Sequence, residues 1–252
     1  MCLNYSPLDQ FEIKNLVNLS LLQSINLSFT NMSFYLVIVG FIVITIHLIN
    51  DNFYKVICNK SSVSQESIYA TIHSIVINQI NDNKGQMFFP FMYTLFVFIL
   101  ANNLVGMVPY SFASTSHFIL TFSLSFTIVI GATILGFVIH MFKFFSLLVP
   151  AGCPLALLPL LVLIEFISYL ARNVSLGLRL AANILSGHML LNILSGFTYN
   201  IMNSGFLYFI VALLPLSFII AFSALEIGIA FIQAQVFVVL SCSYIKDGLS
   251  LH

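Results

Sequence analysis

Charged side chains are scarce in this chain: they make up 6% of its 252 residues, and the formal net charge is zero. A soluble domain has about a quarter of its residues charged, so the composition excludes that class. Zero net charge also leaves no basic surface for nucleic acid. Apolar residues reach 60% and occur in continuous runs, unlike the short alternating segments of a membrane β-barrel. The sequence therefore predicts an all-α polytopic membrane protein.

Motifs for metals, nucleotides and disulfides are missing as well. The cysteines lie far apart without a CxxC pair, at Cys2, Cys58, Cys153 and Cys242. This spacing favours lone buried thiols over structural disulfides or a thiolate metal site. The six histidines form no short-range pair, and the chain contains neither HExxH nor a GxxxxGK[ST] phosphate loop. We therefore expect no metal site and no cofactor.

The N-terminal residues carry no basic targeting signal. Asp9 and Glu12 precede the first basic residue, Lys14, so the n-region of a secretory signal and an Arg-rich transit peptide are both missing. This favours a protein synthesised in the compartment where it is inserted. The absence of Trp beside 26 Phe fits an AT-biased organellar genome.

Five apolar stretches are long enough to cross a bilayer. They follow an N-terminal segment (1–31) and belong to one integral membrane domain (32–252). Between the first two spans, isoleucines at helical spacing among polar residues predict an amphipathic interfacial helix over 64–83. The spans are expected at about 32–49, 88–108, 118–142, 159–195 and 205–244.

The last two spans are too long for an upright crossing. As one helix, 159–195 would rise about 55 Å, whereas the hydrocarbon core is about 30 Å thick. The final span is similar in length and carries Pro215 as an expected bend. We therefore predict a strongly tilted helical hairpin over 155–245. With five spans the termini lie on opposite sides, and the lysine bias places the C-terminus on the side of synthesis.

A polar stripe runs along the fourth span. Glu165, Arg172 and Arg179 are seven residues apart, which puts them on one helix face because seven residues fall about 20° short of two turns. Asn183 and Ser186 extend this face. An arginine in a membrane segment costs roughly 2.5–3.5 kcal/mol on insertion scales unless it faces protein or water. The stripe therefore predicts an ion or proton path.

Arginine keeps its proton under working conditions, so Arg179 cannot be a link in a proton wire. A fixed cation can stabilise a carboxylate opposite it and repel a passing cation. The alternative is a structural role in which Arg172 and Arg179 pair with Glu165 or with backbone carbonyls. Arg172 could also snorkel to the interface.

Groups that can carry protons are Glu165, Glu226 and His188. His188 lies nine residues past Arg179 and is therefore about 180° around the helix. On the last span, Glu226 and Gln233 are seven residues apart and share a face. This geometry suggests two polar paths with the arginine between them. The alternative is that His188 is only hydrogen-bonded and that Gln233 and Asn183 join helices by hydrogen bonds.

The motifs around this stripe resemble subunit a of the F-type ATP synthases, most strongly its mitochondrial, fungal-like members. The core of the resemblance is SLGLRLAAN at 175–183, preceded by LIEFISY at 163–169 and followed by SGH at 186–188. It extends from about Ser6 to His252 and includes SPLDQFE at 6–12, NNL at 102–104, MVPYSF at 107–112 and SYIKD at 243–247. Residues 1–5 match nothing in the family pattern and are candidates for a leader removed after synthesis.

This resemblance implies roles for the polar residues. The arginine of SLGLR faces a rotor ring in this family and separates two aqueous half-channels, which implies that role for Arg179, with Asn183 and Gln233 as its companions. His188 and Glu226 match the pair on the intermembrane-space half-channel, and Glu165 matches an acidic position on the matrix exit. Secondary candidates are Arg172, Ser175, Ser186, Asn102 and Asn103.

The implied function is that of a non-catalytic stator subunit that couples proton flow to rotation and ATP synthesis. Implied partners are protons, the lipid bilayer, a rotor ring of small c-type hairpin subunits, the peripheral stalk and other membrane-sector subunits. The implied location is the mitochondrial inner membrane, with the N-terminus in the intermembrane space and the C-terminus in the matrix.

Two other function classes stay open at this point. An ion-coupled secondary transporter would show an internal repeat with paired broken helices, and the hydropathy shows no such symmetry. A non-conducting assembly subunit would not need Arg179, His188 and Glu226 on interior faces.

Overall fold

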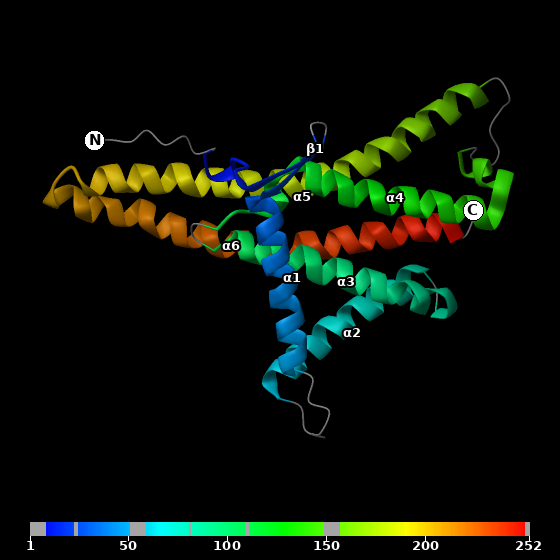
Figure 1. Ribbon diagram of the computed structural model, residues 1–252, viewed down its shortest axis with the longest axis horizontal. Coiled ribbons are helices and arrows are strands. Elements are labelled where there is room, and N and C mark those ends of the chain that lie inside the picture. The colour runs from blue at the N-terminus through cyan, green and yellow to red at the C-terminus, as the bar shows by residue number, and fades with distance from the viewer. Residues whose placement is uncertain are drawn as a thin grey trace. The chain divides into compact units, whose positions relative to one another are not determined.

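Six α-helices dominate the described part of the chain, which comprises residues 9–22, 25–50, 59–80, 82–108, 111–148 and 157–249 of a computed structural model (Figure 1). Five helices are long and apolar enough to cross a membrane. This confirms the predicted polytopic, mainly α-helical class. The helices are α1 (Asn31–Asn50), α2 (Lys60–Ile80), α3 (Asp82–Gly106), α4 (Phe118–His140), α5 (Leu158–Met202) and α6 (Phe206–Leu249). Short 3₁₀ turns cover Asp9–Phe11, Ser114–Ser116 and Met141–Leu148.

The N-terminal segment contains a β-hairpin that the sequence analysis did not predict. Strand β1 (Asn15–Leu22) pairs antiparallel with β2 (Ile25–Thr30), with Asn15 opposite Thr30 and Leu19 opposite Leu27. Apolar and polar residues alternate along β2, which is the period of a strand. The hairpin leads directly into α1 through a reciprocal cap: Thr30 N donates to Ser33 Oγ (3.1 Å), and Ser33 N donates to Thr30 Oγ1 (3.5 Å).

The observed helix bounds extend several predicted ones. Helix α2 covers Lys60–Ile80 where an interfacial helix was expected over 64–83, and α3 already begins at Asp82. Helix α5 is 45 residues long and continues to Met202, so it rises about 68 Å. Pro215 lies inside α6 without ending it. Each of α5 and α6 is about twice as long as the hydrocarbon core of a bilayer is thick. A tilted hairpin is therefore still the expected arrangement of these two helices.

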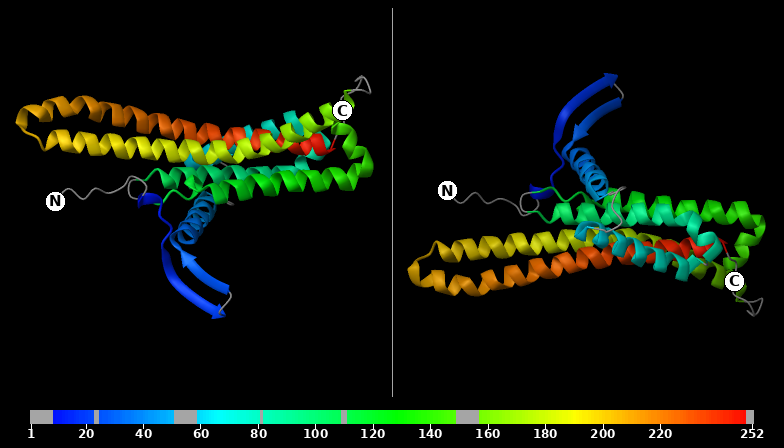
Figure 2. Two further views of the ribbon diagram at one scale, coloured as in Figure 1. Left: turned by 90° about the horizontal axis from the view of Figure 1, so that it is seen from above. Right: turned by 90° about the horizontal axis from the view of Figure 1, so that it is seen from below.

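Contacts divide the chain into two compact units, and α5 and α6 pass through both. The first unit comprises Met1–His47, Phe98–His117 and Ala181–Ala234. Within it, the second half of α5 and the first half of α6 lie antiparallel and side by side (Figures 1 and 2). The turn between them uses Gly205 at φ 151°, a backbone conformation that favours glycine.

The second unit comprises Leu48–Val97, Phe118–Leu180 and Gln235–His252. Helix α2 buries Ile72, Val76 and Ile80 at four-residue spacing, which places them on one face of the helix. At the C-terminal end of α4, the His140 ring nitrogen Nε2 lies 3.1 Å from the carbonyl oxygen of Leu249 on α6. Cys242 is a buried free thiol, whereas Cys2, Cys58, Cys153 and residues 1–5 lie outside the described residues.

Candidate functional site

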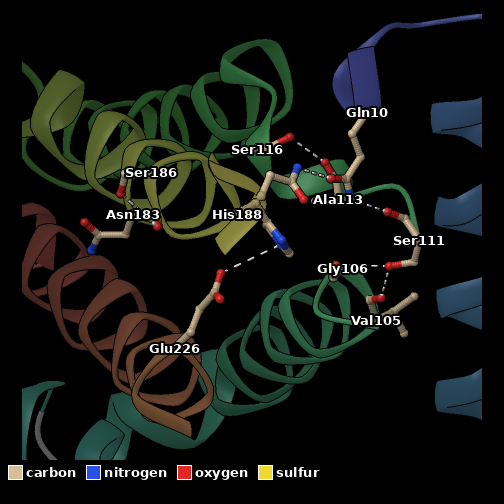
Figure 3. A network of polar contacts seen from close by, with 11 residues as sticks. Gln10, Val105, Gly106, Ser111, Ala113, Ser116, Asn183, Ser186, His188 and Glu226 are labelled. Atoms are coloured by element: carbon tan, nitrogen blue, oxygen red, sulfur yellow. Dashed lines mark hydrogen bonds and ion pairs between the residues drawn. The ribbon is translucent and has the colours of Figure 1, made fainter. Parts of the chain in front are cut away.

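The first unit brings together His188 of α5 and Glu226 of α6, which are 38 positions apart in the chain. His188 Nε2 lies 3.9 Å from Glu226 Oε1, and the two residues are only 8% and 5% exposed (Figure 3). The distance is in the range of an ion pair but exceeds that of a hydrogen bond. Within the described residues neither of these two atoms has a hydrogen-bond partner. A small approach of the side chains, or one shared water, would connect them for proton transfer.

Gly187 makes this approach of α6 to α5 possible. A Cβ at position 187 would lie 2.6 Å from Glu226 Oε1 and 2.9 Å from Glu226 Cδ. The absent side chain therefore leaves the space that the Glu226 carboxyl group occupies. The glycine is part of the site by geometry, although it was not among the predicted site residues.

Asn102 and Asn103, two secondary candidates at the end of α3, are fully buried in the same unit. Asn103 Nδ2 donates to the carbonyl oxygen of Ala230 (3.4 Å), one turn beyond Glu226 on α6. Asn102 Nδ2 donates to Phe98 O (2.8 Å), and its Oδ1 accepts from Ser114 Oγ (2.8 Å). The two amides thus connect α3 to α6 and to the segment that follows α3.

That segment, Ser111–His117, forms a buried polar loop that the sequence analysis left unassigned. Its residues 111–116 are all buried. The Ser111 hydroxyl is shared between the carbonyl oxygens of Val105 (2.7 Å) and Gly106 (3.0 Å) at the end of α3, and Val105 O also accepts from Val108 N (3.2 Å). Thr115 Oγ1 and His117 Nε2 have no partner within the described residues. Such buried polar atoms are typical places for internal water.

His117 lies outside the membrane-crossing stretches, stacked on Phe112 with ring centroids 5.0 Å apart. Burial lowers the pKa of His117 below its ordinary value of 6.5, because the charged imidazolium loses hydration. Its neutral form is therefore favoured at neutral pH. A run of Ser and Thr followed by His, directly after an apolar span, was the signal in the sequence that could have indicated this loop.

The arginine stripe lies mostly in the second unit. Arg172 Nη1 lies 4.0 Å from Asp247 Oδ2 of α6, with side chains 44% and 33% exposed. Near this pair, the rings of Tyr169 and Tyr244 meet edge to face with centroids 6.2 Å apart. The structural alternative for Arg172 thus has a partner, but it is Asp247, which sequence reasoning missed, and neither Glu165 nor a backbone carbonyl.

Arg179 differs from Arg172. It is exposed, and within the described residues it makes neither an ion pair nor a hydrogen bond. The opposite side of α5 is packed: a Cβ on Gly177 would lie 3.0 Å from Ser125 Oγ and 3.3 Å from Thr121 O, both on α4. Packing against α4 therefore turns the guanidinium of Arg179 outward. The spacing of nine residues predicts that Arg179 and His188 lie on opposite faces of α5, and His188 is buried.

The other predicted residues lie on the same two helices. Ser186 Oγ donates to Asn183 O (3.2 Å), and Asn183 is partly buried. Gln233 is partly buried two turns beyond Glu226, Glu165 is partly buried, and Ser175 is exposed. Within the described residues no group of three or more His, Cys, Asp or Glu side chains could hold a metal ion.

Comparison with known proteins identifies the family of the chain. The family model described as "ATP synthase A chain" matches residues 32–246. Proteins called "ATP synthase subunit a" are similar over nearly the whole chain. Those of Cochliobolus heterostrophus and Penicillium chrysogenum are 74% and 73% identical, each covering 98% of this chain and 97% of their own length. That of Kluyveromyces lactis is 49% identical with the same coverage. The chain therefore belongs to the ATP synthase A chain family.

Proposed function

We propose that this chain forms two proton half-channels against a rotor ring of small hairpin subunits. Its coarser role follows from the family: it is the non-catalytic, proton-translocating subunit in the membrane sector of ATP synthase, where it assembles with other subunits. With its apolar helices and fungal relatives, it is a multi-pass protein of the mitochondrial inner membrane. The ion-coupled transporter is not favoured.

The observation that carries the proposal is the contrast between two sites on α5. One is the buried His188–Glu226 pair, whose facing atoms lie 3.9 Å apart and lack other partners within the described residues. The other is Arg179, exposed and unpaired within the described residues. The two positions are nine residues apart, which is a rise of about 13.5 Å. The pair can exchange protons, whereas the arginine can act only as a fixed charge.

In the proposed mechanism a proton enters from the intermembrane space, passes His188 and Glu226, and neutralises a carboxylate on the rotor ring. A neutral carboxyl group can face lipid at much lower cost than a carboxylate, so the ring can turn. The site releases its proton toward the matrix near Glu165. Arg179 favours the ionised rotor site in the gap between the half-channels and repels protons that would leak directly across.

The remaining candidates support these steps. Asn183 and Gln233 are proposed companions of Arg179, with Ser175 and Ser186 beside it on α5. Asn102 and Asn103 are proposed to line the entry side, which agrees with their full burial in the unit that holds His188. Arg172 and its partner Asp247 are proposed for the exit side, in the unit that holds Arg179. Peripheral-stalk subunits are the other proposed partners, with the N-terminus in the intermembrane space and the C-terminus in the matrix.

The driving force limits how much each proton contributes. One charge crossing 100 mV supplies about 2.3 kcal/mol, so several protons are needed for each ATP. This is why a rotating ring with many carboxylates suits the task. The chain itself makes no phosphate bond.

The test is Arg179→Gln, compared with Arg172→Gln seven residues earlier on the same helix. Proton-driven ATP synthesis and passive proton leak are measured in inner-membrane vesicles, with ATP hydrolysis by the attached soluble head as the assembly control. We expect Arg179→Gln to abolish synthesis while hydrolysis by the assembled head survives. Arg172→Gln is expected to retain more synthesis, because its exposed ion pair is worth little. Synthesis near the normal rate with Arg179→Gln would contradict the proposal.

A further inference from the structure

The N-terminal turn Asp9–Phe11 packs against the helix face that carries His188. Phe11 is 8% exposed and joins a buried cluster with Ala113 and Ile184, against which Leu185 and Met189 pack. Ile184 lies one turn before His188, so the phenylalanine covers the same stripe of α5. The rings of Phe11 and His188 meet edge to face, with centroids 6.2 Å apart and planes at 63°.

Gln10 fastens this turn at two points. Its Nε2 donates to the carbonyl oxygen of Ser111 (3.1 Å), and its Oε1 accepts from Asn192 Nδ2 (2.8 Å). Asn192 is one turn beyond His188 on the same face of α5. One amide side chain therefore joins the polar loop after α3 to the helix that carries the histidine. Figure 3 shows Gln10 beside the loop of Ser111 and Ala113, with His188 between this loop and Glu226.

These contacts form a closed ring that includes the His188–Glu226 pair. Helix α3 reaches α6 through Asn103 and Ala230, one turn beyond Glu226. Helix α6 meets α5 at the pair itself. Gln10 and Ser111 then return from α5 to the end of α3. Gln10 provides the hydrogen bonds of this ring on the α5 side, where the apolar cluster of Phe11, Ala113 and Ile184 also lies.

We propose that Gln10 and Phe11 are positioning residues for His188: Gln10 holds the α5 face against the polar loop, and Phe11 holds the imidazole toward Glu226 and covers it from water on that side. The proposal rests on the proposed function only in assigning His188 to the proton path. The role of Gln10 and Phe11 in controlling the exposure of the imidazole follows from their contacts alone, whatever the part of His188 in proton transfer. With a gap of 3.9 Å to Glu226, Nε2 of the imidazole has no hydrogen-bond partner among the described residues, so packing contacts contribute to the orientation of the ring.

The experiment measures the reactivity of His188 in the whole ATP synthase complex, reconstituted in lipid. Diethyl pyrocarbonate is the probe, because it modifies neutral imidazole in proportion to its accessibility, and modification at His188 is followed by mass spectrometry. Proton-driven ATP synthesis is measured on the same samples. The variants are Phe11→Ala, Phe11→Leu and Gln10→Leu. The matched control is Val39→Ala, which truncates a deeply buried apolar residue (1% exposed) on α1 of the same unit.

We expect Phe11→Ala to raise the modification rate of His188 severalfold and to lower ATP synthesis severalfold. Phe11→Leu should partly restore both, because leucine refills much of the apolar cluster. Gln10→Leu keeps the side-chain size and removes both hydrogen bonds. It therefore tests the contribution of Gln10 even if the Phe11→Ala complex fails to assemble. Val39→Ala should leave the reactivity of His188 unchanged.

Wild-type reactivity and synthesis in an assembled Phe11→Ala or Gln10→Leu complex would overturn the proposal. An equal rise in reactivity with Val39→Ala would also overturn it, because general loosening of the unit would then explain the effect. Glu226→Gln is measured in parallel. If that variant keeps normal ATP synthesis, the proposed proton path fails, while the reactivity of His188 still decides the role of Gln10 and Phe11.

Discussion

Replacing Gly187 by alanine should lower proton-driven ATP synthesis, although alanine is the better helix former. The added methyl group would lie 2.6 Å from Glu226 Oε1, whereas ordinary contact begins at 3.4 Å. The carboxyl group must therefore retreat by about 0.8 Å, the difference between these two values. Since the methyl group comes from α5, the retreat is away from the helix that carries His188, and the present 3.9 Å gap widens.

The size of the effect follows from the sensitivity of proton transfer to geometry. A misplacement of about 1 Å can lower a rate about a hundredfold, and a positioned acid or base contributes about 10²–10⁴-fold. We therefore expect Gly187→Ala to lower the rate of ATP synthesis by about ten- to a hundredfold. The helix itself should not be destabilised, because glycine in a helix interior is less favourable than alanine by about 1 kcal/mol.

The assay is ATP synthesis by the assembled complex in inner-membrane vesicles at fixed proton-motive force, normalised to ATP hydrolysis by the head. The control is Gly196→Ala on the same helix, where a Cβ would have no neighbour within 4 Å among the described residues. It should keep normal synthesis. Normal synthesis in an assembled Gly187→Ala complex would refute the reasoning, since the Glu226 carboxyl group could then move without consequence.

Three further predictions concern stability. Gly177→Ala places a Cβ 3.0 Å from Ser125 Oγ, so overpacking should destabilise the α4–α5 contact by about 1–3 kcal/mol; the melting temperature of the complex should fall, and an unchanged value would contradict this. The Arg172–Asp247 pair, 4.0 Å apart and partly exposed, should show a coupling energy below about 1 kcal/mol in a double-mutant cycle, and a much larger value would show a stronger interaction than this geometry allows. Because burial lowers the pKa of His117 below 6.5, the unfolded chain binds more protons there, so stability should decrease as the pH falls below about 6.5. Thermal melting of the wild type and of His117→Gln at a series of pH values checks this, and the variant should show a weaker decrease.

The membrane-crossing helices could be predicted from the sequence because the signal is local. A run of apolar residues long enough to span the bilayer is visible without knowledge of any partner. The opposite placement of Arg179 and His188 was also predictable, since it depends only on their spacing along one helix. The hairpin of β1 and β2 was missed although its alternation of apolar and polar residues is visible, because it precedes the apolar spans on which the interpretation relied.

The pairings within the site could not be predicted, because they join residues that are distant in the chain. Gln10 and Asn192 are 182 positions apart, and Asn103 and Ala230 are 127 apart. Neither contact leaves a local pattern. The same holds for Asp247, which follows the last apolar span and gains its importance only from the proximity of Arg172.

The sequence by itself determined the membrane class, the helix spans and the face of α5 on which each ionisable group lies, since hydropathy and helical periodicity act over a few residues. Only the tertiary structure decided which of these groups meet. Close packing at Gly187 brings Glu226 to His188, and burial of the loop after α3 places Ala113 in the apolar cluster with Phe11 and Ile184. The physical reason is that a contact between helices depends on the shapes of both surfaces, and a single helix carries the information for only one of them.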